Sequence, residues 1–80
     1  MNLHPFAAYL TQRNCAVSTL TAYVHDSREF LRWWRRTPTK VTRKDLDVYV
    51  RLLSERGLSA KTVCRKFSAI STFFKFMRYT

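Results

Sequence analysis

The stretch RGLSAKTVCRKFSAISTFFKFM, from Arg56 to Met77, decides the fold class of this 80-residue chain. Its apolar residues recur every three or four positions, which is the spacing of one face of an α-helix. Gly57 can end a preceding helix in the left-handed conformation, and Ser59 can cap the helix that follows. The stretch carries five cations and no acidic residue, whereas a helix stabilised by its surface charges would mix the two signs. This pattern predicts a helix with one core face and one cationic face.

The same periodicity continues upstream and predicts four helices in all, over residues of about 4–14, 18–36, 42–56 and 59–78. Pro5 suits the first turn of a helix, and Ser18 can cap the second helix. Thr42 and Asp45 have the spacing of a capping box. One glycine and two prolines leave little room for the many tight turns of a β-sandwich. We therefore expect an all-α fold of four helices.

The chain also has a faint internal repeat, with an offset of 43 residues that places Arg13-Asn14 on Arg56-Gly57. At the same offset, Thr19 falls on Thr62. Asn14 and Gly57 are the residue types that best tolerate a positive φ, so each can end one helix and begin the next. The repeat predicts two helical hairpins of similar design.

The charge of the chain is large and unevenly distributed. Fifteen Lys and Arg residues against five Asp and Glu residues give a net charge of +10 and an isoelectric point near 10.5. All five acidic residues lie between positions 26 and 55, so the last 25 residues hold six basic groups and no acid. A polyanion, either nucleic acid or an anionic membrane, is the natural partner of such a surface, although a basic helical face is often simply solvated.

The apolar stripes leave a small, hydroxylated and cationic face on the second and on the fourth predicted helix. Hydroxyl, ammonium and guanidinium groups bond phosphates and base edges, and the free N–H groups of a helix N-terminus favour a phosphate. The face of the second helix is formed by Ser18, Thr19, Thr21, Ala22, His25 and Arg28, and the face of the fourth by Ala60, Lys61, Cys64, Arg65, Ser68, Ser71, Thr72 and Lys75.

Several other classes of protein are disfavoured. Cys15 and Cys64 are too few for a disulfide scaffold, and with His4 and His25 they lack the paired spacing of a zinc site. We expect no metal and no cofactor. The longest early apolar run, from Phe6 to Leu10, is far shorter than the ~20 residues that span a membrane. These observations favour a soluble, reduced, cytoplasmic protein without a membrane partner.

Segments along nearly the whole chain, from Phe6 to Met77, resemble patterns of the tyrosine recombinases, the family of phage integrases and Xer-like enzymes. The family's G-L-S-x-x-T and L-S-A-L patterns have counterparts in the fourth predicted helix, and its T-L-x-A-Y-x-x-D pattern has one in the second. The matching residues are Thr19-Leu20, Ala22-Tyr23, Asp26, Phe30, Val41-Thr42, Asp45-Leu46, Tyr49-Val50, Leu53, Gly57-Leu58-Ser59, Thr62-Val63, Phe67-Ser68-Ala69-Ile70 and Phe73-Phe74.

This resemblance implies a single core-binding domain over residues 1–80. It is the SAM-like four-helix orthogonal bundle that accompanies a separate catalytic domain in such recombinases. In the family, the two domains clamp duplex DNA, and the second and fourth helices of the module cross the major groove. The resemblance also implies a tetramer of the full-length protein on DNA, and a bacterial or phage-encoded protein associated with the nucleoid. The contact positions that it implies are Thr19, Thr21, Ala22 and His25 on the second helix, and Lys61, Thr62, Arg65 and Ser68 on the fourth.

The chain departs from the family's pattern at three places. Cys15-Ala16 replaces a common Leu-Ser, which moves the expected cap of the second helix to Ser18. Ser27 replaces a usual core Leu, a loss of volume for which a tryptophan at position 33 or 34 can compensate. Adjacent helical residues lie ~100° apart, so only one of these tryptophans is expected to face the core. Ser71 replaces a frequent Arg.

Catalysis is not expected of this chain alone. The family's tyrosine nucleophile and its Arg, His and Lys partners belong to the catalytic domain. Tyr79 follows Lys75 and Arg78 with no histidine nearby in the sequence, and His25 has no recognisable nucleophile or carboxylate partner. We therefore expect the chain to bind and position DNA rather than to cut it.

Two other functions remain open from the sequence. A stand-alone helix-turn-helix regulator needs a tight turn before its recognition helix, and the segment from Arg56 to Ser59 has a suitable length. A basic helical bundle that binds a membrane or an acidic protein needs an exposed apolar stripe beside its charges, whereas the apolar stripes here are all needed for a core.

Overall fold

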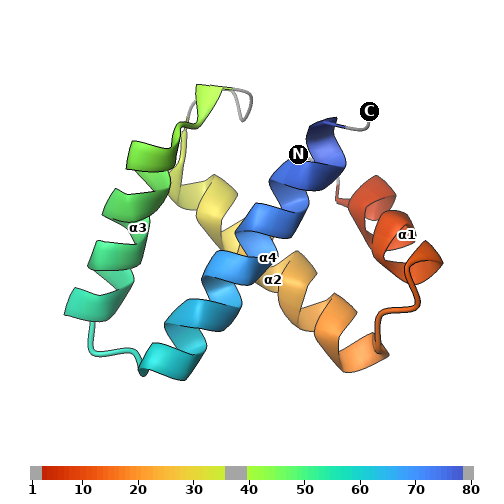
Figure 1. The fold of residues 1–80 in the computed structure, drawn as a ribbon, viewed down its shortest axis with the longest axis horizontal. Coiled ribbons are helices and arrows are strands. Elements are labelled where there is room, and N and C mark those ends of the chain that lie inside the picture. Colours follow the sequence, from red (N-terminus) through yellow and green to blue (C-terminus); the bar gives the residue numbers. More distant parts are fainter. Residues whose placement is uncertain (1–2, 36–39, 79–80) are drawn as a thin grey trace.

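The computed structural model describes residues 3–35 and 40–78, and the long elements of this part of the chain are four α-helices. They are α1 (His4–Gln12), α2 (Val17–Trp33), α3 (Arg43–Glu55) and α4 (Ala60–Arg78). Figure 1 shows α2 and α4 crossing at the centre of the molecule, with α3 and α1 on opposite sides of the crossing. The predicted all-α, four-helix fold is confirmed. The predictions for Arg36 and for Tyr79 lie outside the described residues.

The turns after α1 and α3 have the same geometry. Asn14 adopts a φ of 59° and Gly57 a φ of 85°. In each turn, the N–H of the following residue donates to a carbonyl five residues earlier, from Cys15 to Leu10 (3.2 Å) and from Leu58 to Leu53 (3.4 Å). This is the helix-ending pattern that a left-handed residue permits. Both succeeding helices begin three residues after the left-handed residue, so the predicted repeat is present in the backbone.

Two of the three predicted N-caps are confirmed. The side chains and backbones of Thr42 and Asp45 form a reciprocal capping box at the start of α3. Ser59 Oγ accepts from the N–H of Thr62 (3.2 Å) at the start of α4. The predicted cap at Ser18 is wrong, because α2 already begins at Val17 and its N-cap is Ala16, which has no capping side chain. The repeated turn explains this, since it places Ala16 where the other hairpin has Ser59.

The C-terminal end of α2 also differs from the prediction. The helix ends at Trp33, and Trp34 has an extended backbone (φ −85°, ψ 101°) instead of continuing the helix toward residue 36. Trp33 and Trp34 are both half-buried, and both pack against the same core cluster. The expectation that only one of them faces the core is therefore wrong. It assumed adjacent helical positions, and the chain leaves the helix between them.

The core consists of two clusters of buried side chains. One joins α2, α3 and α4, and the other joins the start of the chain and α1 to the C-terminal half of α4. Phe6 meets Phe73 edge to face with ring centroids 5.1 Å apart, and Phe30 meets Tyr49 in the same way at 5.0 Å. Among the tyrosines, Tyr49 is buried, whereas Tyr9 and Tyr23 are half-buried. The buried apolar members are Phe30, Tyr49, Leu53, Val63 and Ile70 in the first cluster, and Leu3, Phe6, Leu10 and Phe73 in the second.

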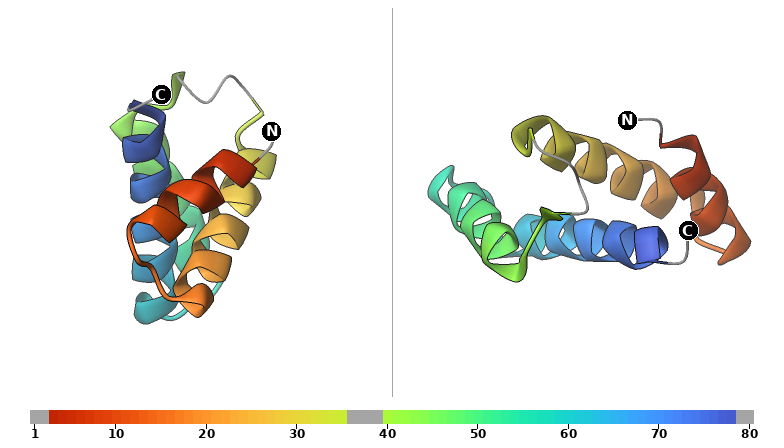
Figure 2. Two further views of the ribbon diagram at one scale, coloured as in Figure 1. Left: turned by 90° about the vertical axis from the view of Figure 1, so that its right-hand side faces the viewer. Right: turned by 90° about the horizontal axis from the view of Figure 1, so that it is seen from above.

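The arrangement of the helices brings two of their N-termini to one edge of the molecule. Figure 1 and the left view of Figure 2 show the first turns of α2 (orange) and α4 (cyan) at the lower edge, while the start of α1 and the end of α4 lie in the upper half. The right view of Figure 2 shows that α2 and α4 form two layers. No helix among the described residues is long and apolar enough to cross a membrane.

Candidate nucleic-acid interface

The residues predicted to contact nucleic acid lie on the two crossing helices, and many of them lie near the lower edge. Ser18, Thr19, Thr21 and Ala22 belong to the first two turns of α2, and Lys61, Thr62 and Arg65 to those of α4. His25, Arg28 and Ser68 lie nearer the middle of the helices. Thr19, Ala22 and Thr62 are half-buried, whereas the other seven are exposed.

On α4, the exposed polar side chains follow one stripe. Lys61, Arg65, Ser68, Thr72 and Lys75 are separated by alternating steps of four and three residues, which keeps them on one side of a helix. All but the half-buried Thr72 are exposed. The stripe therefore runs from the lower edge of the molecule toward the C-terminal end of α4.

Arg65 is held by an acidic residue of α2. The side chain of Asp26 is fully buried, and its two carboxylate oxygens accept from Arg65 Nε (3.1 Å) and Nη2 (3.2 Å). The Arg65 side chain remains 47% exposed, so the guanidinium lies at the border between the helix crossing and solvent. α4, which carries no acidic residue, thus obtains an acidic partner for Arg65 from α2.

Lys66 extends this contact into a cluster. Its ammonium group, whose side chain is 9% exposed, donates to Asp26 Oδ1 (3.0 Å) and to Glu29 Oε1 (3.1 Å). Burial acts to lower the pKa of Lys66, but the hydrogen bonds and charges of the two carboxylates outweigh it, and the pKa lies above that of an ordinary lysine. We call Asp26, Glu29, Arg65 and Lys66 the crossing cluster; its two acids and two bases balance.

Tyr49 connects α3 to the crossing cluster. Its hydroxyl donates to Glu29 Oε1 over 3.4 Å. Burial and the neighbouring Glu29 carboxylate raise the pKa of Tyr49 to about 12. His25 also approaches Glu29, with Nε2 3.8 Å from Oε2. His25 therefore does have a carboxylate neighbour, contrary to the expectation from sequence.

The periodicity of the sequence does not predict the crossing cluster, although the sequence contains a signal for it. Asp26 and Lys66 both fall within the apolar stripes of their helices, and a charged residue at such a position needs a partner. What the sequence does not reveal is which helix faces which, because the two charges lie 40 positions apart.

The positive charge of Lys61 is not balanced by a neighbouring acidic residue. Neither Lys61 nor Arg28 forms an ion pair with any acidic residue in the described part of the chain. Both are exposed. Of the lysines and arginines among the ten predicted contact residues, Lys61 and Arg28 are therefore uncompensated, whereas Arg65 is paired.

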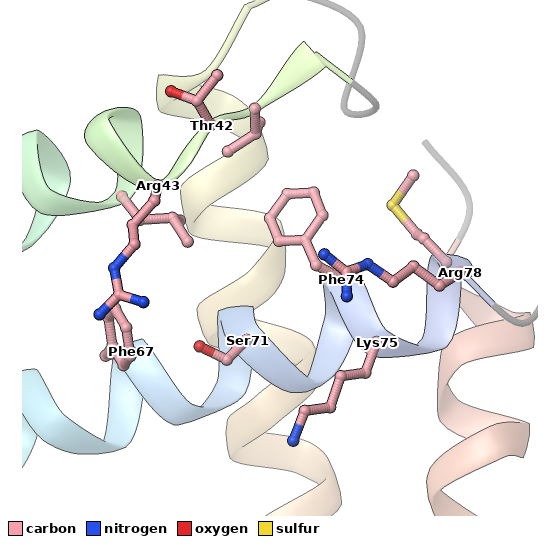
Figure 3. A pocket seen from close by; sticks show the side chains of 10 residues that line it. Thr42, Arg43, Phe67, Ser71, Phe74, Lys75 and Arg78 are labelled. Carbon is pink, nitrogen blue, oxygen red and sulfur yellow. The ribbon is translucent and has the colours of Figure 1, made fainter.

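A separate groove of about 690 Å³ lies between the start of α3 and the C-terminal half of α4 (Figure 3). Its floor is apolar and aromatic, and Arg43, Lys75 and Arg78 contribute cations to it. No group of three or more His, Cys, Asp or Glu side chains in residues 3–35 and 40–78 is arranged to hold a metal ion. The lining residues are Val41, Thr42, Arg43, Leu46, Phe67, Ser71, Phe74, Lys75, Met77 and Arg78.

Comparison with known proteins places this architecture in a family. The family model described as "Phage integrase, N-terminal SAM-like domain" matches residues 3–79. The chain belongs to this family. The match covers α1 to α4 in full, so the SAM-like domain includes both crossing helices and the crossing cluster.

Curated relatives of this SAM-like domain are tyrosine recombinases. The chain is 35% identical to tyrosine recombinase XerC of Listeria monocytogenes serotype 4a over 77 residues, which cover 90% of the chain and 26% of the relative. It is 33% identical to tyrosine recombinase XerD of Chlorobaculum tepidum, over 94% of the chain and 26% of the relative. The chain thus spans about a quarter of the length of these relatives. No solved structure matches it significantly.

Proposed function

We propose that this SAM-like domain is the core-binding module of a tyrosine recombinase and that it grips duplex DNA through α2 and α4. The observation that carries the proposal is the common edge at which both helices begin, with hydroxyl groups from α2 and an uncompensated lysine from α4. Backbone N–H groups at helix N-termini and hydroxyl side chains bond phosphates. The Lys61 ammonium strengthens binding further, because it releases counterions from the DNA when it neutralises a phosphate. The proposed contacts are Ser18, Thr19, Thr21, Ala22, His25, Arg28, Lys61, Thr62, Arg65 and Ser68.

In this proposal the module positions DNA and a separate catalytic domain performs strand exchange. The relatives, which are about four times as long as this chain, are named tyrosine recombinases, and this supports a parent protein of that class. We further propose that residues 1–80 form one binding domain and that the full-length protein assembles as a tetramer on DNA. The isolated module should bind weakly, with a Kd on the order of micromolar at physiological salt.

The exposed apolar side chains argue against a membrane-binding bundle. Among the described residues, the large exposed apolar side chains are Val17, Val48 and Leu58, which belong to α2, to α3 and to the turn before α4. They form no stripe along one helix, as insertion into a membrane surface requires.

A salt titration of single lysine variants tests the proposed interface. Lys61→Ala should lower the affinity for a duplex oligonucleotide several-fold and flatten the slope of log K against log salt by about 0.9, as for one lost phosphate contact. Lys44→Ala is the matched control, because it removes the same charge from an exposed position at the start of α3, on the opposite edge. Equal effects of the two substitutions on affinity and slope would contradict the assignment of the edge.

A variant of Arg65 is less suitable for this first test. The bond of Arg65 to the buried Asp26 means that Arg65→Ala changes the helix crossing as well as the surface. A symmetric footprint of a dimer on two half-sites would instead favour the stand-alone helix-turn-helix regulator.

A further inference from the structure

We infer that Asp26 is a positioning residue that presents Arg65 to DNA as a fixed hydrogen-bond donor, and that Arg65 discriminates between base pairs instead of adding electrostatic affinity. The inference rests on the proposed function, because it concerns a residue of the same interface.

The first support is the set of donors that Arg65 retains. A guanidinium has five N–H groups in a planar fork. Asp26 accepts from the Nε N–H and from one N–H of Nη2, which lie side by side along one edge of the planar guanidinium. Three N–H groups remain, two on Nη1 and one on Nη2. The Nη1 and Nη2 groups together form the fork that matches the O6 and N7 acceptors of guanine in the major groove.

The second support is the rigidity of the arrangement. The Asp26 side chain is fully buried, and its Oδ1 is also held by the buried Lys66. Lys66 in turn bonds Glu29, which accepts from Tyr49 of α3. The carboxylate that grips Arg65 is thus anchored by two neighbouring helices. A donor fixed in this way loses little side-chain entropy when it meets a base edge.

The third support is electrostatic. The crossing cluster contains as many negative as positive groups, so Arg65 is locally neutralised. A neutralised cation releases few counterions when it reaches DNA, whereas Lys61 carries an uncompensated charge on the same helix. The two residues should therefore differ in kind: Lys61 strengthens binding to any duplex, and Arg65 acts through the direction of its hydrogen bonds.

The experiment uses a pool of duplexes randomised at their central positions, with the bound fraction sequenced for the wild type and each variant. The wild type should enrich a preferred base pair, with G·C at one position. Arg65→Gln should abolish the preference at that position, lower the average affinity for the pool less than Lys61→Ala does, and leave the salt slope unchanged. Arg65→Lys should not restore the preference, since an ammonium lacks the planar fork.

Two variants separate positioning from charge. Asp26→Asn and Glu29→Gln each remove one negative charge from α2, but only Asp26 contacts Arg65. Asp26→Asn should lose the same base preference as Arg65→Gln, and Glu29→Gln should keep it. Combined with Arg65→Gln, Asp26→Asn should change the preference no further. The thermal unfolding of each variant is first followed by circular dichroism. Binding is then measured at a temperature below the onset of the unfolding transition.

The possible results are distinguishable. If the folded wild type binds no duplex DNA, both the proposed function and this inference are overturned. Binding of the wild type without any base preference would overturn this inference alone. A salt slope for Arg65→Gln that falls as much as that of Lys61→Ala would show a phosphate contact and overturn it too. A preference that survives in folded Asp26→Asn would show that Asp26 is only a structural tie. If Asp26→Asn does not fold, Asp26→Glu takes its place, because it keeps the charge but displaces the carboxylate that holds Arg65. An unchanged base preference in Asp26→Glu would then overturn the positioning role.

Discussion

At the scale of single residues, Ser27 is a buried hydroxyl without a partner. It is 1% exposed within α2, and its Oγ forms no hydrogen bond. Most buried hydroxyls in proteins are paired, because water has to be given up to bury them. The resemblance described above leads one to expect a core leucine at this position. The fold therefore tolerates a local loss of stability here.

We expect Ser27→Ala to stabilise the protein by about 1 kcal/mol, because it removes the unpaired hydroxyl and improves helix propensity. Ser68→Ala is the matched control, since Ser68 is exposed on α4 and its replacement changes helix propensity alone. Thermal unfolding followed by circular dichroism should show the larger rise in Tm for Ser27→Ala. Equal shifts for the two variants would mean that the Ser27 hydroxyl is satisfied in solution.

The ionisation of Tyr49 makes the stability of the protein depend on pH in the alkaline range. Its pKa is about 12 in the folded state, against 10.0 for an ordinary tyrosine. Between these values the unfolded chain binds fewer protons than the folded one, so the free energy of unfolding falls as pH rises, by at most about 1.4 kcal/mol per pH unit. The contribution is complete below pH 10 and lost by pH 12. The raised pKa of Lys66 acts in the same direction.

Urea unfolding across this alkaline range should therefore show a shallower decline for Tyr49→Phe than for the wild type. Glu29→Gln should also make the decline shallower, because it removes the carboxylate that helps to raise the pKa of Tyr49. A Tyr49→Phe variant with an unchanged alkaline profile would mean that Tyr49 titrates as it does in the unfolded chain.

At the scale of elements, the two identical turns determine where α2 and α4 begin. Gly57 has a φ of 85°, and a Cβ at this position would meet no atom within 4 Å. Gly57→Ala should therefore cost about 1 kcal/mol from the left-handed backbone alone. Gly57→Asn should cost less, because Asn14 already occupies the equivalent turn with a φ of 59°. Urea denaturation of both variants checks the order, and equal losses would contradict the backbone explanation.

The elements were the most predictable part of the molecule. The three- and four-residue spacing of apolar side chains is a local property, and so are the caps at Thr42 and Ser59 and the left-handed turn at Gly57. The start of α2 was misplaced because its turn uses Ala16, which gives no capping signal. The end of α2 was misplaced because both tryptophans pack on the core, a tertiary preference that overrides helix continuation.

At the scale of the whole molecule, α4 joins two clusters that hold different parts of the chain. Phe73 belongs to the cluster with α1, and its neighbour Phe74 packs against both clusters. The centroids of these two rings are 5.4 Å apart. The ring of Phe6 is fully buried and contacts Phe73 and Phe76, so it anchors α1 to α4.

We expect Phe6→Ala to detach α1 while the crossing of α2 and α4 persists. Removing a buried phenylalanine costs about 3–5 kcal/mol, a large share of the stability of a small domain. Hydrogen exchange should show loss of protection in α1 and retained protection in α2 and α4. Phe30→Ala is the counterpart in the other cluster and should lower protection throughout. Uniform loss of protection in Phe6→Ala would show that the two clusters unfold as one unit.

The candidate interface was only partly predictable from the sequence, because it depends on how the helices pack against one another. Periodicity shows which side of a helix is polar, and this located Lys61 and the hydroxyl groups of α2. It does not show how two helices cross, and the crossing is what pairs Arg65 and Lys66 with the acids of α2. The groove between α3 and α4 also depends on packing between elements, and no local pattern indicated it.

The positions of the first and the last turn of the helical bundle have a practical consequence. Both turns lie in the half of the molecule away from the edge where α2 and α4 begin (Figures 1 and 2). A module immobilised on a sensor surface by either end therefore presents that edge to the solution. Tethering by one end and then by the other should give the same association and dissociation rates for DNA.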